Sequence, residues 1–373
     1  MKNLKSYEIR QMWLDFFASK GHKVVPSASL IPVDDPTLLW INAGVAPLKK
    51  YFDGREKPEN PRLCNAQKSL RTNDIENVGK TARHHTFFEM LGNFSIGDYF
   101  RNEALEFANE LLFDEKWFAI PRNLIYITYY PEDKDTYNKW VSLGVDPTHL
   151  VPIADNFWEI GEGPCGPDTE IFYFRSNEEA PETFDPEDDR WVEIWNNVFM
   201  QYYKDENGAV TELPKKNVDT GMGVERITTV LEGVDDNYKS SIWSDVIDLI
   251  SSITGLPYEG NEKSMRIIAD HIRTAVFISS DPAGIKPSNT DQGYILRRLI
   301  RRAIRHAKKL GIDISSNWEE QIANLIIFKY ESYYSELKEN KQVVLDVLKN
   351  EKEKFNRTLE KGLREFNKVS NKD

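Results

Sequence analysis

The stretch Arg83–Phe94 holds the groups of this chain most suited to chemistry. It places one cation, two imidazoles, a carboxylate and an Asn among three Phe. An exposed loop would not carry so much aromatic surface, and a core strand would not carry so many polar groups, because each buried polar group needs a partner. The mixture favours a pocket that stacks a flat ring and holds charged groups beside it.

Arg71 lies just upstream, where a strand pattern ends and Asn73-Asp74 mark a turn. A guanidinium at this point can hold a phosphate or a carboxylate through two parallel hydrogen bonds. Taken alone, however, Arg71 is more simply explained by an exposed ion pair with Asp74 or Glu76, because such pairs are common and weak.

The stretch Asp219–Arg226 predicts a strand, a tight turn and the start of a helix, because two Gly flank Met222 and an apolar run follows. Glycines allow a backbone to approach a ligand closely, and a helix N-terminus favours anions. The pattern GxGxER is weak by itself and is also typical of a purely structural turn.

Together these three segments resemble the signature motifs of class II aminoacyl-tRNA synthetases, specifically those of the alanyl-tRNA synthetase family. The resemblance extends from Glu8 to about Phe366. It implies that Arg71 and Arg226 are the catalytic residues. Arg71 would bind the α-phosphate of ATP and the carboxylate of the amino acid, and Arg226 would cover the adenine face, a contact that suits a guanidinium.

The same resemblance gives ATP-binding roles to the Arg83–Phe94 stretch. Arg83 and His84 would contact the β- and γ-phosphates or the acceptor end of an RNA. Phe87 or Met90 would pack on adenine, and we expect Phe87 to do so. The competing explanation is that the Phe residues are simply core, alternating in and out of a sheet.

Five further residues would form an alanine pocket by this resemblance. Asp219 would bind the ammonium group, and Gly221 would limit the depth of the pocket. Asn196 would bond the substrate carboxylate, and Val198 would line the methyl site. Trp158 would wall the methyl site, unless it is a core Trp beside a turn rich in Gly and Pro.

The expected cofactors are ATP and Mg²⁺, with Glu193 as a candidate Mg²⁺ ligand. We expect no zinc site. The chain has only two Cys and six scattered His, and the neighbours His84 and His85 would point different ways on a strand. Asp168 stands where relatives often carry a Cys, and we attach no function to that change.

A basic segment in the last third of the chain predicts contacts with RNA. It holds seven Lys or Arg and no acid between Arg297 and Lys309, so that one helix face would be continuously positive. Because no acid lies within the run, we favour phosphate contacts over a face neutralised by ion pairs. By resemblance, Asn289 would contact the G·U pair of a tRNA acceptor stem, whose wide minor groove an Asn can read. The expected tRNA-binding residues are Asn289, Arg297, Arg298, Arg301, Arg302 and Arg305.

The composition is that of a globular protein. The 373 residues are 40% apolar and 12% aromatic, and no run of about 18 apolar residues predicts a membrane span. A net charge of −12 argues against a general nucleic-acid binder, although the basic segment is an exception. Two Cys fit a reducing cytoplasm, and the first 22 residues predict an amphipathic helix rather than a signal peptide.

The element pattern predicts an α+β fold, a class II antiparallel sheet flanked by helices and followed by an all-α region. No GxGxxG or GxxxxGK[ST] pattern supports a Rossmann or P-loop route to nucleotide binding. We expect residues 1–236 to form the aminoacylation domain and residues 237–373 a helical domain that recognises the tRNA acceptor stem. Expected strands are Thr37–Asn42, Leu124–Tyr130, Glu170–Phe174, Trp191–Tyr203 and, after an Asn207-Gly208 turn, Val210–Leu213; expected helices are Met265–Ser279, Tyr294–Leu310 and about Lys341–Asn367.

The resemblance implies that the chain activates L-alanine with ATP and transfers the alanyl group to the 3′ end of tRNA(Ala). The sequence shows no counterpart of the family's editing domain or C-terminal module, so it fits either a catalytic fragment or a naturally reduced enzyme. We expect this form to be a monomer. Two alternatives remain: a ligase that alanylates another acceptor, and an inactive RNA-binding paralogue. Asn289 and the basic segment count against the first, and Arg71, Asp219 and Arg226 count against the second.

Overall fold

The computed structural model describes residues 1–372, apart from the side chain of Asp74. The chain divides into two compact units, and each is built from three separate segments of sequence. The division into a functional domain at residues 1–236 and another at 237–373 is predicted from the sequence. The packing of the chain does not test what each part does, so this division stays a prediction. Unit 1 comprises Met1–Ala28, Asn42–Ser69 and Phe88–Ile242, and unit 2 comprises Ser29–Ile41, Leu70–Phe87 and Trp243–Asp373.

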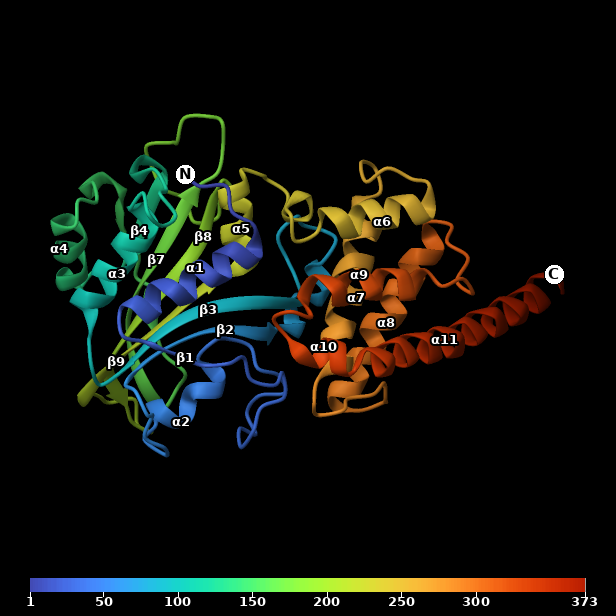
Figure 1. Cartoon of the computed structure of the whole chain (residues 1–373), viewed down its shortest axis with the longest axis horizontal. Coiled ribbons are helices and arrows are strands. Elements are labelled where there is room, and N and C mark those ends of the chain that lie inside the picture. The colour runs from blue at the N-terminus through green and yellow to red at the C-terminus, as the bar shows by residue number, and fades with distance from the viewer. Residues whose placement is uncertain (373) are drawn as a thin grey trace. The chain divides into compact units, whose positions relative to one another are not determined.

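A nine-stranded sheet organises unit 1 (Figure 1). Its strands lie in the order β1-β2-β3-β9-β8-β7-β4-β5, and β6 pairs with β7 outside this path. The central pairs are antiparallel, whereas β1–β2 and β4–β5 are parallel, so the predicted antiparallel sheet is confirmed at its centre and mixed at its edges. The strands are β1 Lys23–Val24, β2 Arg62–Leu70, β3 Phe87–Ile96, β4 Ile125–Tyr129, β5 Leu150–Pro152, β6 Phe157–Trp158, β7 Gly163–Phe174, β8 Trp191–Lys204 and β9 Val210–Gly223.

The β8–β9 hairpin turns where the sequence predicts. Gly208 adopts a φ of +82°, and the Asp205 carboxylate accepts hydrogen bonds from the backbone N–H groups of Asn207 and Ala209. The β9 strand begins at Val210 as predicted but does not end at Leu213; it continues to Gly223. One hairpin therefore presents both the Asn196–Val198 and the Asp219–Gly221 segments.

The strand predicted at Thr37–Asn42 is wrong. The segment consists of turns and bends, since the Asp35 side chain accepts hydrogen bonds from both the backbone N–H and the hydroxyl of Thr37. Such local side-chain bonds compete with strand pairing, and apolar composition alone could not reveal them. The strand predicted at Glu170–Phe174 begins earlier, at Gly163, and the remaining predicted strands and helices are present within a few residues of their expected bounds.

Helices cover the sheet in unit 1 and make up most of unit 2. Figure 1 shows α1 lying across the strands, where its buried Trp13 donates a hydrogen bond to the Gly92 carbonyl of β3. The unit 1 helices are α1 Ser6–Ser19, α2 Lys49–Phe52, α3 Arg101–Phe113, α4 Lys134–Ser142 and α5 Val224–Glu232. Those of unit 2 are α6 Ser244–Thr254, α7 Glu262–Ser280, α8 Asp291–Lys309, α9 Trp318–Tyr330, α10 Ser335–Glu339 and α11 Lys341–Ser370. Short 3₁₀ turns lie at Ala46–Leu48, Thr72–Asn77, Arg122–Leu124, Pro147–His149 and Asn237–Lys239.

The α7 helix is the centre of unit 2. Every residue from Ile267 to Ser280 is buried, including Asp270, His271 and Arg273. The α8 and α9 helices pack against it with apolar faces, whereas α11 buries side chains only as far as Phe355 and then projects into solvent. Among the described residues, no helix is long and apolar enough to cross a membrane.

The close pairing of β7 with β8 generates the first testable prediction. A Cβ added at Gly166 would lie 1.8 Å from the Phe199 carbonyl oxygen, at a point where the β7 register shifts. Because backbone cannot yield as a flexible side chain can, we expect Gly166→Ala to destabilise the fold by about 3 kcal/mol, measured by urea unfolding.

The matched control for this prediction is Gly161→Ala. Gly161 has a φ of +82° but no atom within 4 Å of an added Cβ, so the substitution strains only the local backbone, by about 1 kcal/mol. Equal losses in the two variants would contradict a steric requirement at Gly166.

Candidate active site

The β8–β9 register brings four of the predicted alanine-pocket residues together in unit 1. Asn196 pairs with Gly221, and Val198 pairs with Asp219. Residues directly opposite each other on neighbouring strands share a face, and so do residues two apart on one strand. These four residues therefore occupy adjacent positions on one face of the hairpin.

Asp219 has the electrostatics of a cation site. It is buried, and among the described residues no side chain donates a hydrogen bond or a positive charge to its carboxylate. Burial raises the pKa of Asp219 to about 7, because removing the charge from water disfavours the ionised form. An ammonium ion placed against it would supply the missing partner.

Gly221 lies against the side chain of Met90, which projects from β3. A Cβ at Gly221 would lie 2.7 Å from the Met90 sulfur, so the position accepts no side chain without moving that thioether. Met90 is half-buried, and its sulfur also accepts a hydrogen bond from the Gly44 N–H at 3.4 Å. Gly221 therefore lies in close contact with Met90, two residues along the strand from Asp219.

Of the other three predicted pocket residues, Val198 is buried, whereas Asn196 has an acceptor left unsatisfied within the described part of the chain and Trp158 is partly exposed. The Asn196 Oδ1 is buried without a hydrogen-bond partner among the described residues, and an acceptor in that position calls for a donor. Trp158 lies on β6 and pairs with Gly166 of β7, where it remains half-exposed rather than part of the core. The competing explanation of Trp158 as a core residue is not supported by this exposure.

Three more carboxyl groups lie near this face. Asp168 pairs with Val198 and Glu170 with Asn196, so both share the face of the hairpin residues. Burial, followed by the charge of Glu193, raises the pKa of Asp168 to about 7. Burial, followed by the charges of Glu193 and Asp168, raises the pKa of Glu170 to about 8.

Arg226 stands in the first turn of α5, directly after the β9 strand. Its exposed guanidinium donates to the Glu193 carbonyl at 3.2 Å and lies 3.9 Å from the Glu193 carboxylate. This holds the arginine beside the acidic groups without burying it. Within the described part of the chain, no group of three or more His, Cys, Asp or Glu is arranged to hold a metal ion.

Two buried acids of unit 1, Glu89 and Glu225, have partners that sequence reasoning did not identify. Glu89 of β3 forms a two-pronged ion pair with Arg10 of α1, with N–O distances of 2.7 and 2.9 Å. The Glu89 N–H in turn donates to both carboxylate oxygens of Glu225 at 3.2 and 3.3 Å. A Glu within an apolar strand signals a buried partner, but only the fold identifies that partner as Arg10.

The 71–86 loop, which joins β2 to β3, belongs to unit 2. Arg71 follows β2 directly; its side chain is exposed, and its backbone N–H donates to the Thr86 carbonyl at 3.0 Å. Arg83 is exposed, and the half-buried His84 has its Nδ1 2.6 Å from the Thr81 hydroxyl. The loop thus closes on itself and presents its basic side chains at the surface of unit 2.

Phe87 does not fit the role predicted for it. Its ring is completely buried in unit 2 and stacks on Phe277 with a centroid distance of 3.9 Å, and Arg273 lies over it at 5.1 Å. A ring without an open face cannot pack on adenine, so the structure favours the core explanation. Of the two adenine contacts predicted from sequence, Met90 is the one that keeps exposed surface.

The five predicted tRNA-binding arginines lie on α8, but four of them already have intramolecular partners. Arg297 and Arg301 both donate to the buried Glu351 of α11, at 2.9 and 2.8 Å. Arg298 pairs with Glu76, and Arg302 donates to the Ile75 carbonyl at 2.8 Å. Arg305 is exposed and lies over the Phe355 ring at 5.3 Å.

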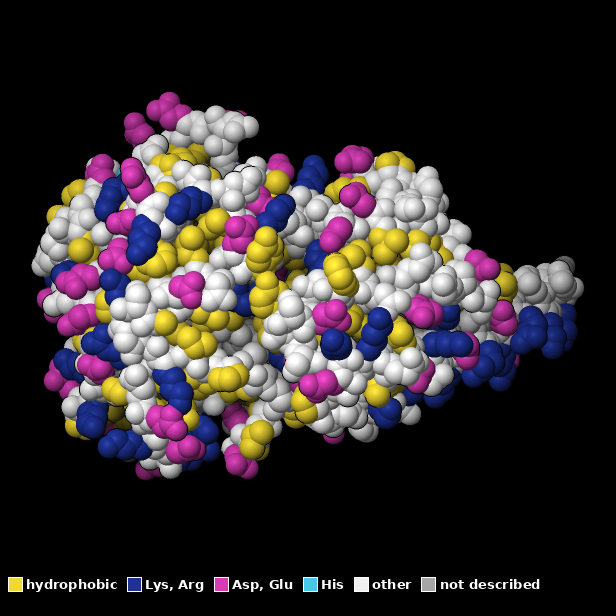
Figure 2. Space-filling view, in the orientation of Figure 1, with side chains coloured by type: hydrophobic (Ala, Val, Ile, Leu, Met, Phe, Trp, Pro, Cys, Tyr) yellow, Lys and Arg dark blue, Asp and Glu magenta, His cyan; other side chains and the backbone are white. Residues whose placement is uncertain are grey.

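The expectation that this basic face lacks acidic partners is therefore wrong. The partners come from α11 and from the 71–86 loop, both distant in sequence, so the absence of acids within the segment was no guide. Lys361, Arg364 and Lys368 are exposed on the projecting end of α11, where Figure 2 shows Lys and Arg side chains gathered. Asn289 is exposed just before α8, and its Oδ1 accepts a hydrogen bond from Arg297 at 2.7 Å.

Comparisons with known proteins identify the family of this chain. A family model described as tRNA synthetases class II (A) matches residues 8–373. Among solved structures, apo S. aureus histidyl-tRNA synthetase aligns with a TM-score of 0.41 at 12% identity, over 63% of this chain and 69% of that chain, and we infer nothing from so low a score.

Curated relatives are much closer in sequence. The alanine–tRNA ligase of Lactococcus lactis subsp. cremoris is 54% identical over 376 residues, and that of Streptococcus suis is 52% identical over 376 residues. Each alignment covers 97% of this chain, which spans 42% of the length of the relative. Because the family model accounts for almost all of the sequence, the chain belongs to the class II (A) tRNA synthetases.

Proposed function

We propose that this chain activates L-alanine with ATP to form alanyl-adenylate, and transfers the alanyl group to the 3′ end of tRNA(Ala). The observation that carries the proposal is Asp219, a buried carboxylate with no cation beside it among the described residues, near Gly221, where an added Cβ would press on the Met90 sulfur. A small amino acid with a free ammonium group satisfies both features. The alanine–tRNA ligases that align with 97% of this chain support the same substrate.

The first reaction needs positioning more than proton transfer. The carboxylate of alanine is already ionised, so it attacks the α-phosphorus of ATP without a general base, and the bond to pyrophosphate breaks as the new P–O bond forms. Asp219 would hold the ammonium group and Asn196 the carboxylate, with Val198 and Trp158 around the methyl group. Catalysis would then come from orientation and from cationic stabilisation of the charge that develops on the phosphate.

ATP would be bound chiefly by basic side chains. Arg71 would take the α-phosphate, and Arg83 and His84 the β- and γ-phosphates. Arg226 would cover adenine, an assignment supported by its exposed guanidinium beside Glu193, and Met90 would contact the base in place of the buried Phe87.

The neighbouring carboxyl groups of Glu193 and Glu170 fit a Mg²⁺ ion that accompanies ATP. Mg²⁺ prefers one or two carboxylates together with substrate phosphates and water, rather than a cage built entirely from protein. The raised pKa of Glu170, caused by burial and then by Glu193, indicates two acids close enough to share a cation. When bound, the ion would neutralise phosphate charge.

In the second reaction, a hydroxyl of the terminal ribose of the RNA attacks the alanyl carbonyl, and AMP leaves. Asn289 would read the G·U pair of the acceptor stem, with the α8 arginines on the RNA backbone. The proposal includes action as a monomer in the cytoplasm. Selection against glycine and serine would be incomplete, since a small pocket rejects a missing methyl or an added hydroxyl only weakly.

The intramolecular contacts of the α8 arginines favour a second candidate function, a ligase that alanylates an acceptor other than tRNA. Arg297, Arg298, Arg301 and Arg302 are engaged within the protein, so RNA phosphates would have to displace carboxylates or share the guanidinium groups. Alanine activation without tRNA charging would favour this candidate.

Arg71→Ala tests the assignment of ATP chemistry. The rate of alanine-dependent pyrophosphate exchange should fall by roughly 100- to 1,000-fold, because a cation that stabilises transition-state charge is lost. The fold should persist, because the side chain is exposed. Lys80→Ala, an exposed cation in the same loop, is the control; an Arg71→Ala rate close to that of Lys80→Ala would remove Arg71 from the site.

The raised pKa of Asp219 predicts a pH dependence of alanine binding. Below about pH 7 the carboxyl is protonated and cannot attract an ammonium ion, so the KM for alanine should be highest near pH 6 and fall as the pH rises through about 7. Asp219→Asn should raise that KM about 30-fold and abolish its pH dependence.

Asp168→Asn is the matched control, because Asp168 has a similarly raised pKa on the same face. This variant should retain the pH dependence of the KM for alanine. Loss of the dependence in Asp168→Asn but not in Asp219→Asn would reassign the ammonium contact to Asp168.

The role of Asn289 is tested by combining a protein variant with an RNA variant. Asn289→Ala should slow charging of tRNA that carries the G·U pair by about tenfold, the usual effect of losing one hydrogen bond. The same substitution should have little further effect on tRNA with a G·C pair at that position. Equal losses with both RNAs, or an equal loss in Thr290→Ala, would exclude a specific contact.

A further inference from the structure

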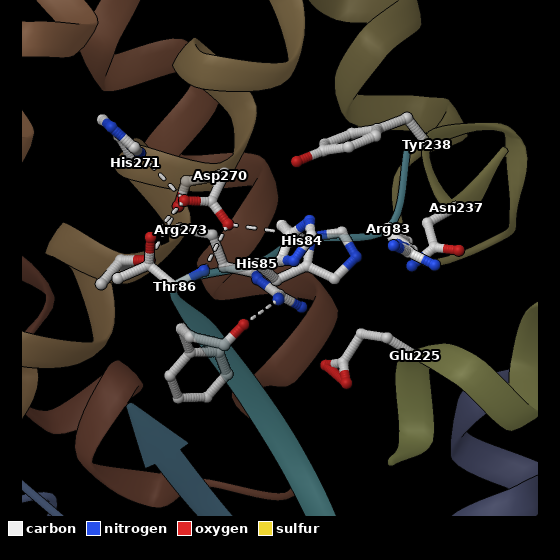
Figure 3. Close-up of polar contacts among 12 residues, drawn as sticks. Arg83, His84, His85, Thr86, Glu225, Asn237, Tyr238, Asp270, His271 and Arg273 are labelled. Carbon is white, nitrogen blue, oxygen red and sulfur yellow. Dashed lines mark hydrogen bonds and ion pairs between the residues drawn. The ribbon is translucent and has the colours of Figure 1, made fainter. Parts of the chain in front are cut away.

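Both ends of the 71–86 loop are held by the helices of unit 2. At its C-terminal end, the Thr86 N–H donates to Asp270 Oδ1 at 2.9 Å, and the Thr86 hydroxyl donates to Asp270 Oδ2 at 2.8 Å. Asp270 projects from the buried face of α7 toward Thr86, as Figure 3 shows. Two hydrogen bonds to one carboxylate fix both the position and the orientation of this residue.

Asp270 carries its negative charge although no part of it is exposed. Burial alone would raise the pKa of its carboxyl group, but the hydrogen bond from His271 and the positive charge of Arg273 hold it below its ordinary value. An ionised acceptor forms stronger hydrogen bonds than a neutral one. The loop is therefore anchored on a buried charge.

His271 extends this contact to the other end of the loop. Its Nδ1 lies 2.9 Å from Asp270 Oδ2, and its Nε2 lies 2.9 Å from Arg302 Nη1. Since Arg302 can only donate, Nε2 accepts and Nδ1 donates to Asp270, which is the pattern of a neutral imidazole. Arg302 Nη1 also donates to the Ile75 carbonyl at 2.8 Å. Thr86, Asp270, His271, Arg302 and Ile75 thus form a continuous series of hydrogen bonds.

The residues on either side of Thr86 are fixed as well. Arg273 donates to the Phe87 carbonyl and stacks on Trp243 at 4.1 Å. The His85 ring stacks on the same Trp243 with a centroid distance of 5.2 Å. Because α7 is buried from Ile267 to Ser280, these contacts fix the C-terminal end of the loop to the core of unit 2.

We propose that Asp270 is a positioning residue for ATP, which sets the 71–86 loop so that Arg71, Arg83 and His84 meet the phosphates. Arg71 is tied to Thr86 by its backbone hydrogen bond, and His84 precedes Thr86 by two residues. Asp270 touches no reacting atom; it acts through Thr86. This inference rests on the proposed adenylation function, because it assumes that the loop binds ATP.

The decisive variants are Asp270→Asn and a pair at Thr86. Asn preserves the shape of Asp270, but its amide nitrogen cannot accept from the Thr86 hydroxyl or from His271. Thr86→Val removes the hydroxyl with little change of volume, whereas Thr86→Ser retains it. The matched control is Asp281→Asn at the end of α7, where the carboxylate accepts from the Ser29 hydroxyl at 2.7 Å and the Leu30 N–H at 2.8 Å but does not contact the loop.

We expect Asp270→Asn and Thr86→Val to raise the KM for ATP in alanine-dependent pyrophosphate exchange by about tenfold, the factor expected for loss of charge-assisted hydrogen bonds. The KM for alanine should stay unchanged, Thr86→Ser should restore the KM for ATP, and Asp281→Asn should match the wild type. In the same variants, hydrogen–deuterium exchange of peptides covering residues 71–86 should be faster in Asp270→Asn than in Asp281→Asn.

Equal ATP KM values in Asp270→Asn and Asp281→Asn would overturn the inference, as would equal rates of hydrogen–deuterium exchange in the loop. Absence of pyrophosphate exchange in the wild type would instead refute the proposed function. The loop's hydrogen–deuterium exchange would still decide whether Asp270 positions it, so the two failures are distinguishable.

Discussion

The pairing register of β8 with β9 is the constraint on which the candidate alanine pocket depends. Side chains alternate between the two faces of a strand, so a slip of one residue would turn Asp219 and Gly221 away from Asn196 and Val198. Close backbone approach at Gly166 fixes the next strand, β7, against β8. The pocket is thus a consequence of strand geometry, and its residues need no flexible loop to hold them.

The face that carries this candidate pocket also holds several carboxyl groups with raised pKa values. Burial raises the pKa of Asp168, Glu170 and Asp219, and the charge of Glu193 raises the first two further. Each ionised carboxylate lacking a partner opposes folding, because the unfolded chain would solvate it. From about pH 4 to about pH 8 the folded state holds protons that the unfolded state releases, so these groups lower stability as the pH rises. Cationic ligands would relieve this cost, which is the physical reason to regard the face as a binding site.

Unit 2 contains a different arrangement, in which the buried carboxylate of Asp270 has several partners. Asp270, His271 and Arg302 satisfy one another and hold the backbone of the 71–86 loop at Ile75 and Thr86. Arginines that sequence assigns to RNA therefore also have an internal structural role. A helix can serve both purposes, because each guanidinium carries five donors and uses only some of them within the protein.

The sequence by itself determined the family resemblance, the α+β class and most of the strands and helices. These depend on local pattern: apolar alternation, turn residues such as Asn207-Gly208, and short motifs around Arg71 and Asp219. The sequence could not decide which residues a side chain would meet across the fold. It therefore missed the burial of Phe87 against Phe277, the pairing of Arg297 and Arg301 with Glu351, and the anchoring of Thr86 on Asp270. Those outcomes belong to tertiary structure, because burial and ion pairing depend on distances between residues that lie tens to hundreds of positions apart in the chain.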